Sequence, residues 1–192
     1  MACVSIKMSK LIRMFQKLGY VNDSNDEIVA YGLKRIYELL IDIVCVIICG
    51  IVMKNVGAAL IFEFTYVPLR VNAGGYHASD EKKCKYLSWI SIVLSIAIIA
   101  YFPIRFYVMH LLMLISSGVI VFLAPVESIN KPLTDTERKV FFHRSIIFIL
   151  TEEFAYILFV FLKAQFSAKA ICVSCVCVAI GLVLGILQQS KV

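Results

Sequence analysis

The chain has 192 residues, of which 61% are hydrophobic and 17% are charged, and its mean hydropathy is +0.89. Soluble domains are about half apolar and about a quarter charged, so this composition excludes an ordinary water-soluble globule. With 9 Gly, 4 Pro and 7 scattered Cys, collagen-like, disordered and disulfide-framework proteins are excluded as well. Because one membrane span takes about 20 mostly apolar residues, we predict a small, all-α, polytopic membrane protein.

The first segment, 1–20, carries apolar residues at helical spacing, including Leu11 and Phe15, with basic residues on the other faces. This pattern predicts an amphipathic helix that either lies in the interface over an anionic leaflet or packs on the rest of the protein. The segment lacks the compact apolar core and small-residue cleavage site of a removable signal sequence, so none is expected.

Apolar stretches and polar intervals alternate through the rest of the chain, and we predict a single membrane domain over 1–192. The second stretch is short for a span, so a re-entrant hairpin is the alternative there. Two polar intervals, 70–85 and 125–144, follow the second and the fourth stretch. The six stretches are 36–53, 56–69, 86–102, 104–123, 145–162 and 170–187.

The distribution of Lys and Arg favours about six transmembrane helices with the N-terminus inside. In that arrangement all but four of the 19 Lys and Arg residues face the cytoplasm, the exceptions being Lys54, Arg105, Lys163 and Lys169. A re-entrant second stretch would invert the later segments and divide the basic residues almost equally. The positive-inside rule therefore predicts a multi-pass plasma-membrane protein with both termini and both polar intervals in the cytoplasm.

The first polar interval contains a histidine and a cysteine, His77 and Cys84. A cysteine nucleophile reacts as its thiolate, and a nearby histidine can accept the proton. On a continuous helix these residues would lie about 10 Å apart along the axis, so the chain must bend between them. Gly74 and Gly75 permit a turn, and Ser79 with the acidic residues after it resembles the start of a new helix. We predict that Cys84 lies in the early turns of that helix and that His77 folds back towards it.

Neighbouring residues are candidates for supporting roles. The backbone N–H groups of Gly74 and Gly75 are candidate oxyanion donors. Arg70 is a candidate either for holding a substrate carboxylate or for bracing the loop. Three acidic residues are candidates for a group that orients His77, and the sequence does not distinguish among them: Glu63, Asp80 and Glu81.

The polar residues allow two other interpretations. A metal site made of His77, Cys84 and His143 lacks a fourth ligand and paired spacing, so no metal and no cofactor are expected. Glu152 and Glu153 lie within an apolar stretch, where ionisable residues mark a passage, a buried pairing or a subunit contact. The cysteines of the apolar stretches are assigned to packing, because small buried cysteines behave as hydrophobes: Cys45, Cys49, Cys172, Cys175 and Cys177.

The run RVNAGGYHASDEKKC at 70–84 resembles the signature of the accessory gene regulator B (AgrB) family. Members of that family are integral membrane cysteine endopeptidases of bacterial quorum sensing. YGL at 31–33, AP at 124–125 and NKPLT at 130–134 match as well, and the resemblance covers nearly the whole chain. It implies that His77 and Cys84 are the catalytic pair.

The resemblance also implies a substrate, a small AgrD-type precursor with an amphipathic leader, a central segment carrying Cys or Ser, and an acidic tail. A chain of net charge +6 with a basic cytoplasmic face suits that tail. Tail removal would proceed through an acyl-thioester, followed by closure of a thiolactone or lactone ring.

The lipid bilayer is the other expected partner, no nucleic acid is expected, and a homodimer is favoured only by the prevalence of pairs. The alternative functions are a non-enzymatic peptide exporter or small transporter, and a scaffold that anchors a partner.

Overall fold

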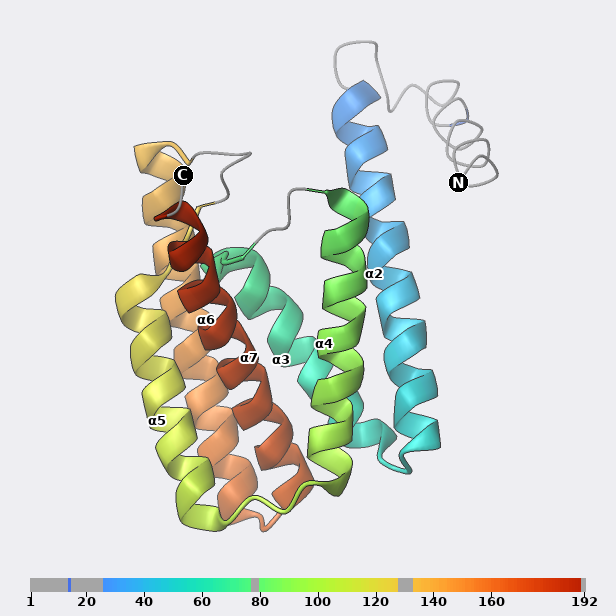
Figure 1. Cartoon of the computed structure of the whole chain (residues 1–192), viewed down its shortest axis with the longest axis vertical. Coiled ribbons are helices and arrows are strands. Elements are labelled where there is room, and N and C mark those ends of the chain that lie inside the picture. The colour runs from blue at the N-terminus through green and yellow to red at the C-terminus, as the bar shows by residue number, and fades with distance from the viewer. Residues whose placement is uncertain (1–13, 15–25, 77–79, 128–132, 191–192) are drawn as a thin grey trace. The chain divides into compact units, whose positions relative to one another are not determined.

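A computed structural model describes residues 14, 26–76, 80–127 and 133–190, so the predicted amphipathic helix at 1–20 lies outside the described residues apart from Met14. The described residues form six α-helices and confirm the all-α fold class (Figure 1). Three of these helices, α4, α5 and α7, are long and apolar enough to cross a membrane. The helices are α2 (Asp26–Val52), α3 (Val56–Ala73), α4 (Glu81–Tyr101), α5 (Phe106–Leu123), α6 (Asp135–Phe161) and α7 (Gln165–Gln189).

The chain divides into two compact units, 1–45 and 46–192, with the boundary inside α2. In the first unit the described part of α2 exposes apolar side chains, including Ile28 and Tyr31. An ion pair one turn apart joins the Arg35 guanidinium to the Glu38 carboxylate at 3.1 Å. Such exposed pairs contribute little to helix stability.

Each predicted apolar stretch coincides with one helix, and local capping explains where two of the helices begin. The Asn55 side chain accepts a hydrogen bond from the backbone N–H of Ala58, which starts α3. Thr134 and Glu137 form a reciprocal capping box, which starts α6 well before its apolar stretch. The second half of the predicted polar interval 125–144 is therefore helical.

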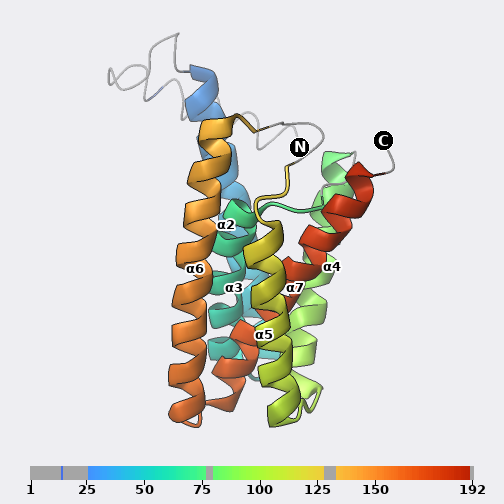
Figure 2. The same ribbon diagram turned by 90° about the vertical axis from the view of Figure 1, so that its left-hand side faces the viewer.

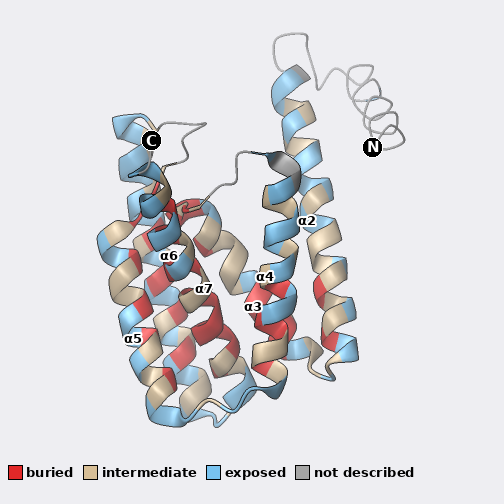
Figure 3. Ribbon diagram, in the orientation of Figure 1, coloured by how far each residue is buried: buried red, intermediate tan, exposed pale blue. Residues whose placement is uncertain are grey.

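Helix α7 is the central element of the second unit, because α3, α4, α5 and α6 all contact it. Its buried positions are largely small residues, such as Ala168, Cys172, Ser174 and Ala179. Figure 3 shows buried positions concentrated along α7 and on the helices beside it. Small residues let helix backbones approach closely, which is the usual way that helices pack where lipid removes the hydrophobic driving force.

Helices α3 to α7 alternate in direction, as Figures 1 and 2 show. The connections before α5 and before α7 lie at one end of this unit, and the turn after α3 lies at the other end with the segment before α6. The last two are joined by a β-bridge between Gly74 and Val126. Large apolar side chains point outward between the ends, and Leu114 of α5 and Phe154 of α6 are 71% and 69% exposed. This distribution is the one expected where lipid covers the outer surface.

Candidate functional site

The site begins at a tight turn where α3 ends. Gly74 caps the helix, and its backbone N–H donates to the Arg70 carbonyl at 3.1 Å. Gly74 and Gly75 have φ angles of 76° and 123°, a region that side-chain-bearing residues rarely adopt. A Cβ at position 74 would collide with the carbonyl of Val126, and one at position 75 would collide with the Arg70 guanidinium. Both the backbone conformation and the lack of space therefore require glycine here.

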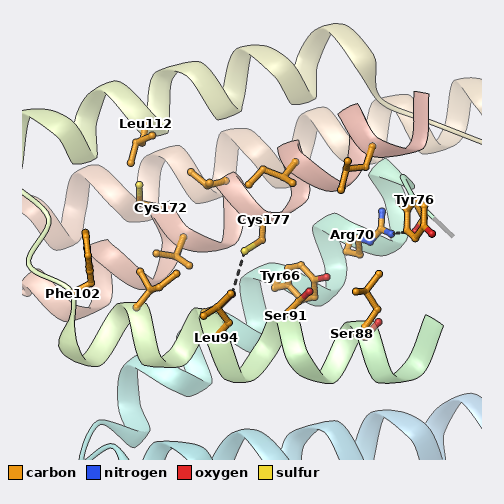
Figure 4. Close-up of a pocket in the computed structure, with 18 of the residues that line it drawn as sticks. Tyr66, Arg70, Tyr76, Ser88, Ser91, Leu94, Phe102, Leu112, Cys172 and Cys177 are labelled. Atoms are coloured by element: carbon orange, nitrogen blue, oxygen red, sulfur yellow. Dashed lines mark hydrogen bonds between the residues drawn. The ribbon is translucent and has the colours of Figure 1, made fainter. Parts of the chain in front are cut away.

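Arg70 braces this turn from inside. One terminal nitrogen of its guanidinium donates to the Gly74 carbonyl, and the other donates to the Tyr76 carbonyl at 2.6 Å (Figure 4). These contacts show Arg70 bracing the loop, which is one of its two candidate roles. A role in holding a substrate carboxylate stays a prediction.

Backbone hydrogen bonds fix the turn to two distant parts of the chain. The N–H of Tyr76 donates to the Gly181 carbonyl of α7 at 2.7 Å, and the N–H of Gly75 donates to the Val126 carbonyl at 3.3 Å. The N–H of Val126 in turn donates to the Ala73 carbonyl at 2.9 Å. Because the N–H groups of both glycines already have backbone partners, an oxyanion role stays a prediction that requires these bonds to be exchanged.

Cys84 lies in the first turn of α4, which confirms its predicted place early in a new helix. Its backbone N–H donates to the Asp80 carbonyl at 3.0 Å, and the residue is half-buried. Cys84 lines a cavity of about 570 Å³, which Arg70 and Tyr76 also line. His77, directly after Tyr76 in the sequence, lies outside the described residues, as does Ser79. Cys84 and Tyr76, the described residue directly before His77, therefore line the same cavity.

The candidates for a third group differ in their surroundings. Asp80 is exposed beside the start of α4, and the side chain of Glu81 lies outside the described residues. Glu63 is only 2% exposed on α3. It precedes Arg70 by seven residues, which is about 10 Å along a helix. The structure therefore brings Arg70 and the glycines together at the turn, while Glu63 lies two helical turns deeper.

The acids of α6 form hydrogen bonds with neighbouring helices. The Glu152 carboxylate accepts from the Cys175 thiol of α7 at 3.0 Å, and the Glu153 carboxylate accepts from the Ser117 hydroxyl of α5. His110 bonds instead to a tyrosine hydroxyl of α6 at 2.7 Å. Cys175 is fully buried, in agreement with its assignment to packing. Within the described ranges, no group of three or more His, Cys, Asp and Glu side chains is arranged to hold a metal.

Sequence reasoning missed several residues that shape the site. Tyr76, Val126 and Gly181 hold the turn through backbone atoms, which leave no mark in the side-chain pattern. A signal was present on α4, where Ser88 and Ser91 follow Cys84 at spacings of four and three residues. That spacing places all three on one helix face.

Glu127 organises the second polar interval. Its carboxylate accepts from the backbone N–H of Leu133 at 3.2 Å and pairs with the Arg138 guanidinium. Its backbone carbonyl accepts from the Gln189 side-chain amide at 2.8 Å. The interval is thereby tied to the end of α7, next to the turn that Gly181 holds.

Comparison with known proteins gives matches over most of the chain. The family model described as Accessory gene regulator B matches residues 8–183. AgrB-like protein 2 of Clostridium perfringens (strain 13 / Type A) is 31% identical over 156 residues, which cover 75% of this chain and 71% of that relative. An AgrB-like protein of C. perfringens (strain SM101 / Type A) has the same identity and coverage. No solved structure matches.

Proposed function

Because the chain belongs to the accessory gene regulator B family, we propose that it is a membrane cysteine endopeptidase that processes an AgrD-type precursor peptide. Membership supports a role in accessory gene regulator quorum sensing, with an AgrD-type peptide as the substrate and association with a membrane. One observation carries the proposed chemistry. Cys84 and Tyr76, the residue that directly precedes His77, line the same cavity, beside a turn that Arg70 braces.

In the proposed reaction Cys84 is the nucleophile and His77 carries the proton. The imidazole accepts the thiol proton, and the thiolate sulfur attacks the carbonyl carbon of the peptide bond before the tail. As the carbon–nitrogen bond breaks, the imidazolium returns the proton to the leaving amine. The tail departs, and the rest of the precursor remains on Cys84 as an acyl-thioester.

The same pair then serves ring closure. The precursor's own thiol or hydroxyl attacks the thioester carbonyl, its proton passes through His77 to the departing Cys84 sulfur, and a thiolactone or lactone forms. Water is the competing nucleophile. A half-buried Cys84 that opens onto a largely apolar cavity favours cyclisation over hydrolysis, because few water molecules reach the thioester.

The proposed arrangement in the plasma membrane is a single 1–192 domain with six crossings, an interfacial helix at 1–20, and both termini and the catalytic loop in the cytoplasm. The structure supports it through the placement of basic residues. Lys54 and Lys163 lie in the short connections at one end of the second unit, whereas the two polar intervals meet at the other. A homodimer stays a prediction.

Substitution of the catalytic pair tests the proposal. With a co-expressed AgrD-type precursor, Cys84→Ala and His77→Ala should each abolish tail removal while the protein still accumulates in membranes. Matched controls are Cys49→Ala, in α2, and His143→Ala, whose Nδ1 is hydrogen-bonded to the Lys139 carbonyl at 2.7 Å. Both should retain cleavage. Tail removal that persists in both catalytic variants would show that the mechanism is wrong.

The alternative function, a peptide exporter or small transporter without enzymatic activity, is favoured by one observation. Glu152 is 5% exposed within the long helix α6, and buried acids at membrane depth usually belong to transport pathways or buried networks. An exporter should lose secretion in Glu152→Gln or Glu153→Gln and be indifferent to Cys84→Ala. The endopeptidase should show the reverse dependence in a cleavage assay.

A further inference from the structure

The cavity beside Cys84 follows α4 along its whole length. It begins at Cys84 in the first turn and reaches Phe102, just after the last turn. That separation is roughly 27 Å at about 1.5 Å per helical residue. Figure 4 shows the cavity between α4 and α7, with Tyr66 and Arg70 of α3 on its wall. Its volume of about 570 Å³ lies within the range of ligand pockets.

The lining combines apolar side chains with a row of hydroxyl groups. Leu87, Ile98 and their neighbours on α5 and α7 form most of the surface. Ser88, Ser91 and Ser95 follow Cys84 on one face of α4, at successive spacings of four, three and four residues. The nucleophile is therefore the first member of a polar stripe that runs along the apolar cavity.

This combination suits a peptide better than a lipid chain. A peptide that enters a water-poor region needs hydrogen-bond partners for its N–H and C=O groups, because a polar group left unsatisfied there is strongly unfavourable. A serine hydroxyl both donates and accepts, so a row of them can serve an extended backbone. A hydrocarbon tail gains nothing from hydroxyls. At the deeper serine, Ser95 Oγ is hydrogen-bonded to Cys177 Sγ of α7 at 3.2 Å.

We propose that this cavity binds the residues that precede the cleaved bond of the precursor and that these residues are apolar, an inference that rests on the proposed endopeptidase function. The residue before that bond becomes the acyl group on Cys84. This residue and those before it must therefore lie in the space that is open to the Cys84 sulfur, which is the cavity. The acidic tail lies on the other side of the bond, towards Lys83 and Lys85, which flank Cys84. The cavity thereby selects a precursor with large apolar residues at the end of its signal segment.

Filling the cavity and then shrinking the substrate tests this assignment. Ser91→Phe should lower tail release from the co-expressed AgrD-type precursor at least tenfold. A precursor whose two residues before the cleaved bond are alanine should be cleaved by Ser91→Phe within about threefold of the rate of the unaltered enzyme with that same precursor. Val93→Phe is the matched control, because Val93 is on α4, 43% exposed and outside the cavity lining. It should cleave both precursors normally.

A second measurement leaves the enzyme unchanged, so it does not depend on the folding of a variant. Aspartate at the residue before the cleaved bond should lower tail release by the unaltered enzyme at least tenfold, because the cavity would have to desolvate a charge. Aspartate added within the tail should leave the rate of tail release unchanged. Full cleavage of the first precursor would overturn the assignment.

Other outcomes separate the two proposals. Normal cleavage by Ser91→Phe, or an equal loss with both precursors, overturns the cavity assignment and indicates that a lipid chain or packing fills the space. In either case a dependence on Cys84 leaves the endopeptidase function standing. Equal tail release by the unaltered enzyme and Cys84→Ala overturns that function and the cavity assignment with it.

Discussion

At the scale of single residues, Arg70 holds the turn through a geometry that lysine cannot reproduce. Its planar guanidinium donates to the Gly74 and Tyr76 carbonyls at once. A lysine ammonium is a point charge and can reach only one such carbonyl well. The turn carries Tyr76, which directly precedes His77, so its geometry bears on where the proposed proton acceptor lies.

We therefore predict that Arg70→Lys lowers the rate of tail release. A hydrogen bond to a charged group contributes about 1.5–3 kcal/mol, so loss of one should reduce the rate on the order of tenfold or more. The rate is measured with a co-expressed precursor and normalised to the protein present in membranes. Arg105→Lys is the control, because Arg105 lies in the connection before α5 and bonds only Tyr107 among the contacts described for its side chain. Equal rates in the two variants would contradict the bracing role.

At the scale of helices, α7 supplies the surface on which the turn rests. The Gly181 carbonyl accepts the hydrogen bond from the Tyr76 N–H, and Gly185, one helical turn further along α7, is buried. A Cβ at Gly185 would approach the Gly75 carbonyl carbon to 2.8 Å and the Tyr76 nitrogen to 2.9 Å. The spacing is the small-xxx-small pattern that usually joins two helices, and here it receives a loop instead.

We predict that Gly185→Ala displaces the turn and impairs tail release, although alanine normally stabilises a helix by about 0.5–1 kcal/mol relative to glycine. Gly118→Ala in α5 is the matched control, since a Cβ there meets nothing within 4 Å. The control should keep full activity and equal or greater thermal stability in detergent. The prediction is wrong if both variants cleave the precursor at the unaltered rate.

Sequence periodicity and composition predicted the helices well, because each apolar stretch is bounded by polar residues and all but the one at 56–69 are long. The stretch at 56–69 became α3, which continues to Ala73 because glycines with positive φ end it only there. The turn and the helical place of Cys84 were likewise local, so Gly74, Gly75 and the acidic residues before Cys84 sufficed to predict them.

The anchoring of that turn was not predictable in the same way. Tyr76 and Gly181 are separated by more than a hundred residues, and they meet through backbone atoms. Backbone contacts of this kind place little demand on side-chain identity, apart from the glycines at 74, 75 and 185, where a Cβ would meet the contacting backbone. Bracing was one of two roles that the sequence offered for Arg70; its contacts in the structure show the bracing, and the role in holding a substrate carboxylate stays a prediction.

At the scale of the whole molecule, the direction of each helix decides which end of the protein faces the cytoplasm. Lys54 and Lys163 are exposed in connections between helices, and both have positive φ. Lys139 is exposed near the start of α6, which follows the polar interval that contacts the turn. With six crossings, Lys54 and Lys163 face outward and Lys139 faces the cytoplasm. If α3 were re-entrant, Lys54 would still lie outside, but Lys139 would also lie outside and Lys163 would face the cytoplasm.

We predict the six-crossing pattern in a labelling experiment on Lys54→Cys, Lys163→Cys and Lys139→Cys. Each is placed in a background whose 7 native cysteines are alanine, and intact cells are treated with a membrane-impermeant maleimide. The first two positions should be labelled in intact cells, and position 139 only after the membrane is permeabilised. Labelling at 54 and 139 without 163 would instead establish that α3 turns back within the membrane. The chain would then present the proposed catalytic loop on the outer side, against the positive-inside rule and away from the proposed cytoplasmic precursor.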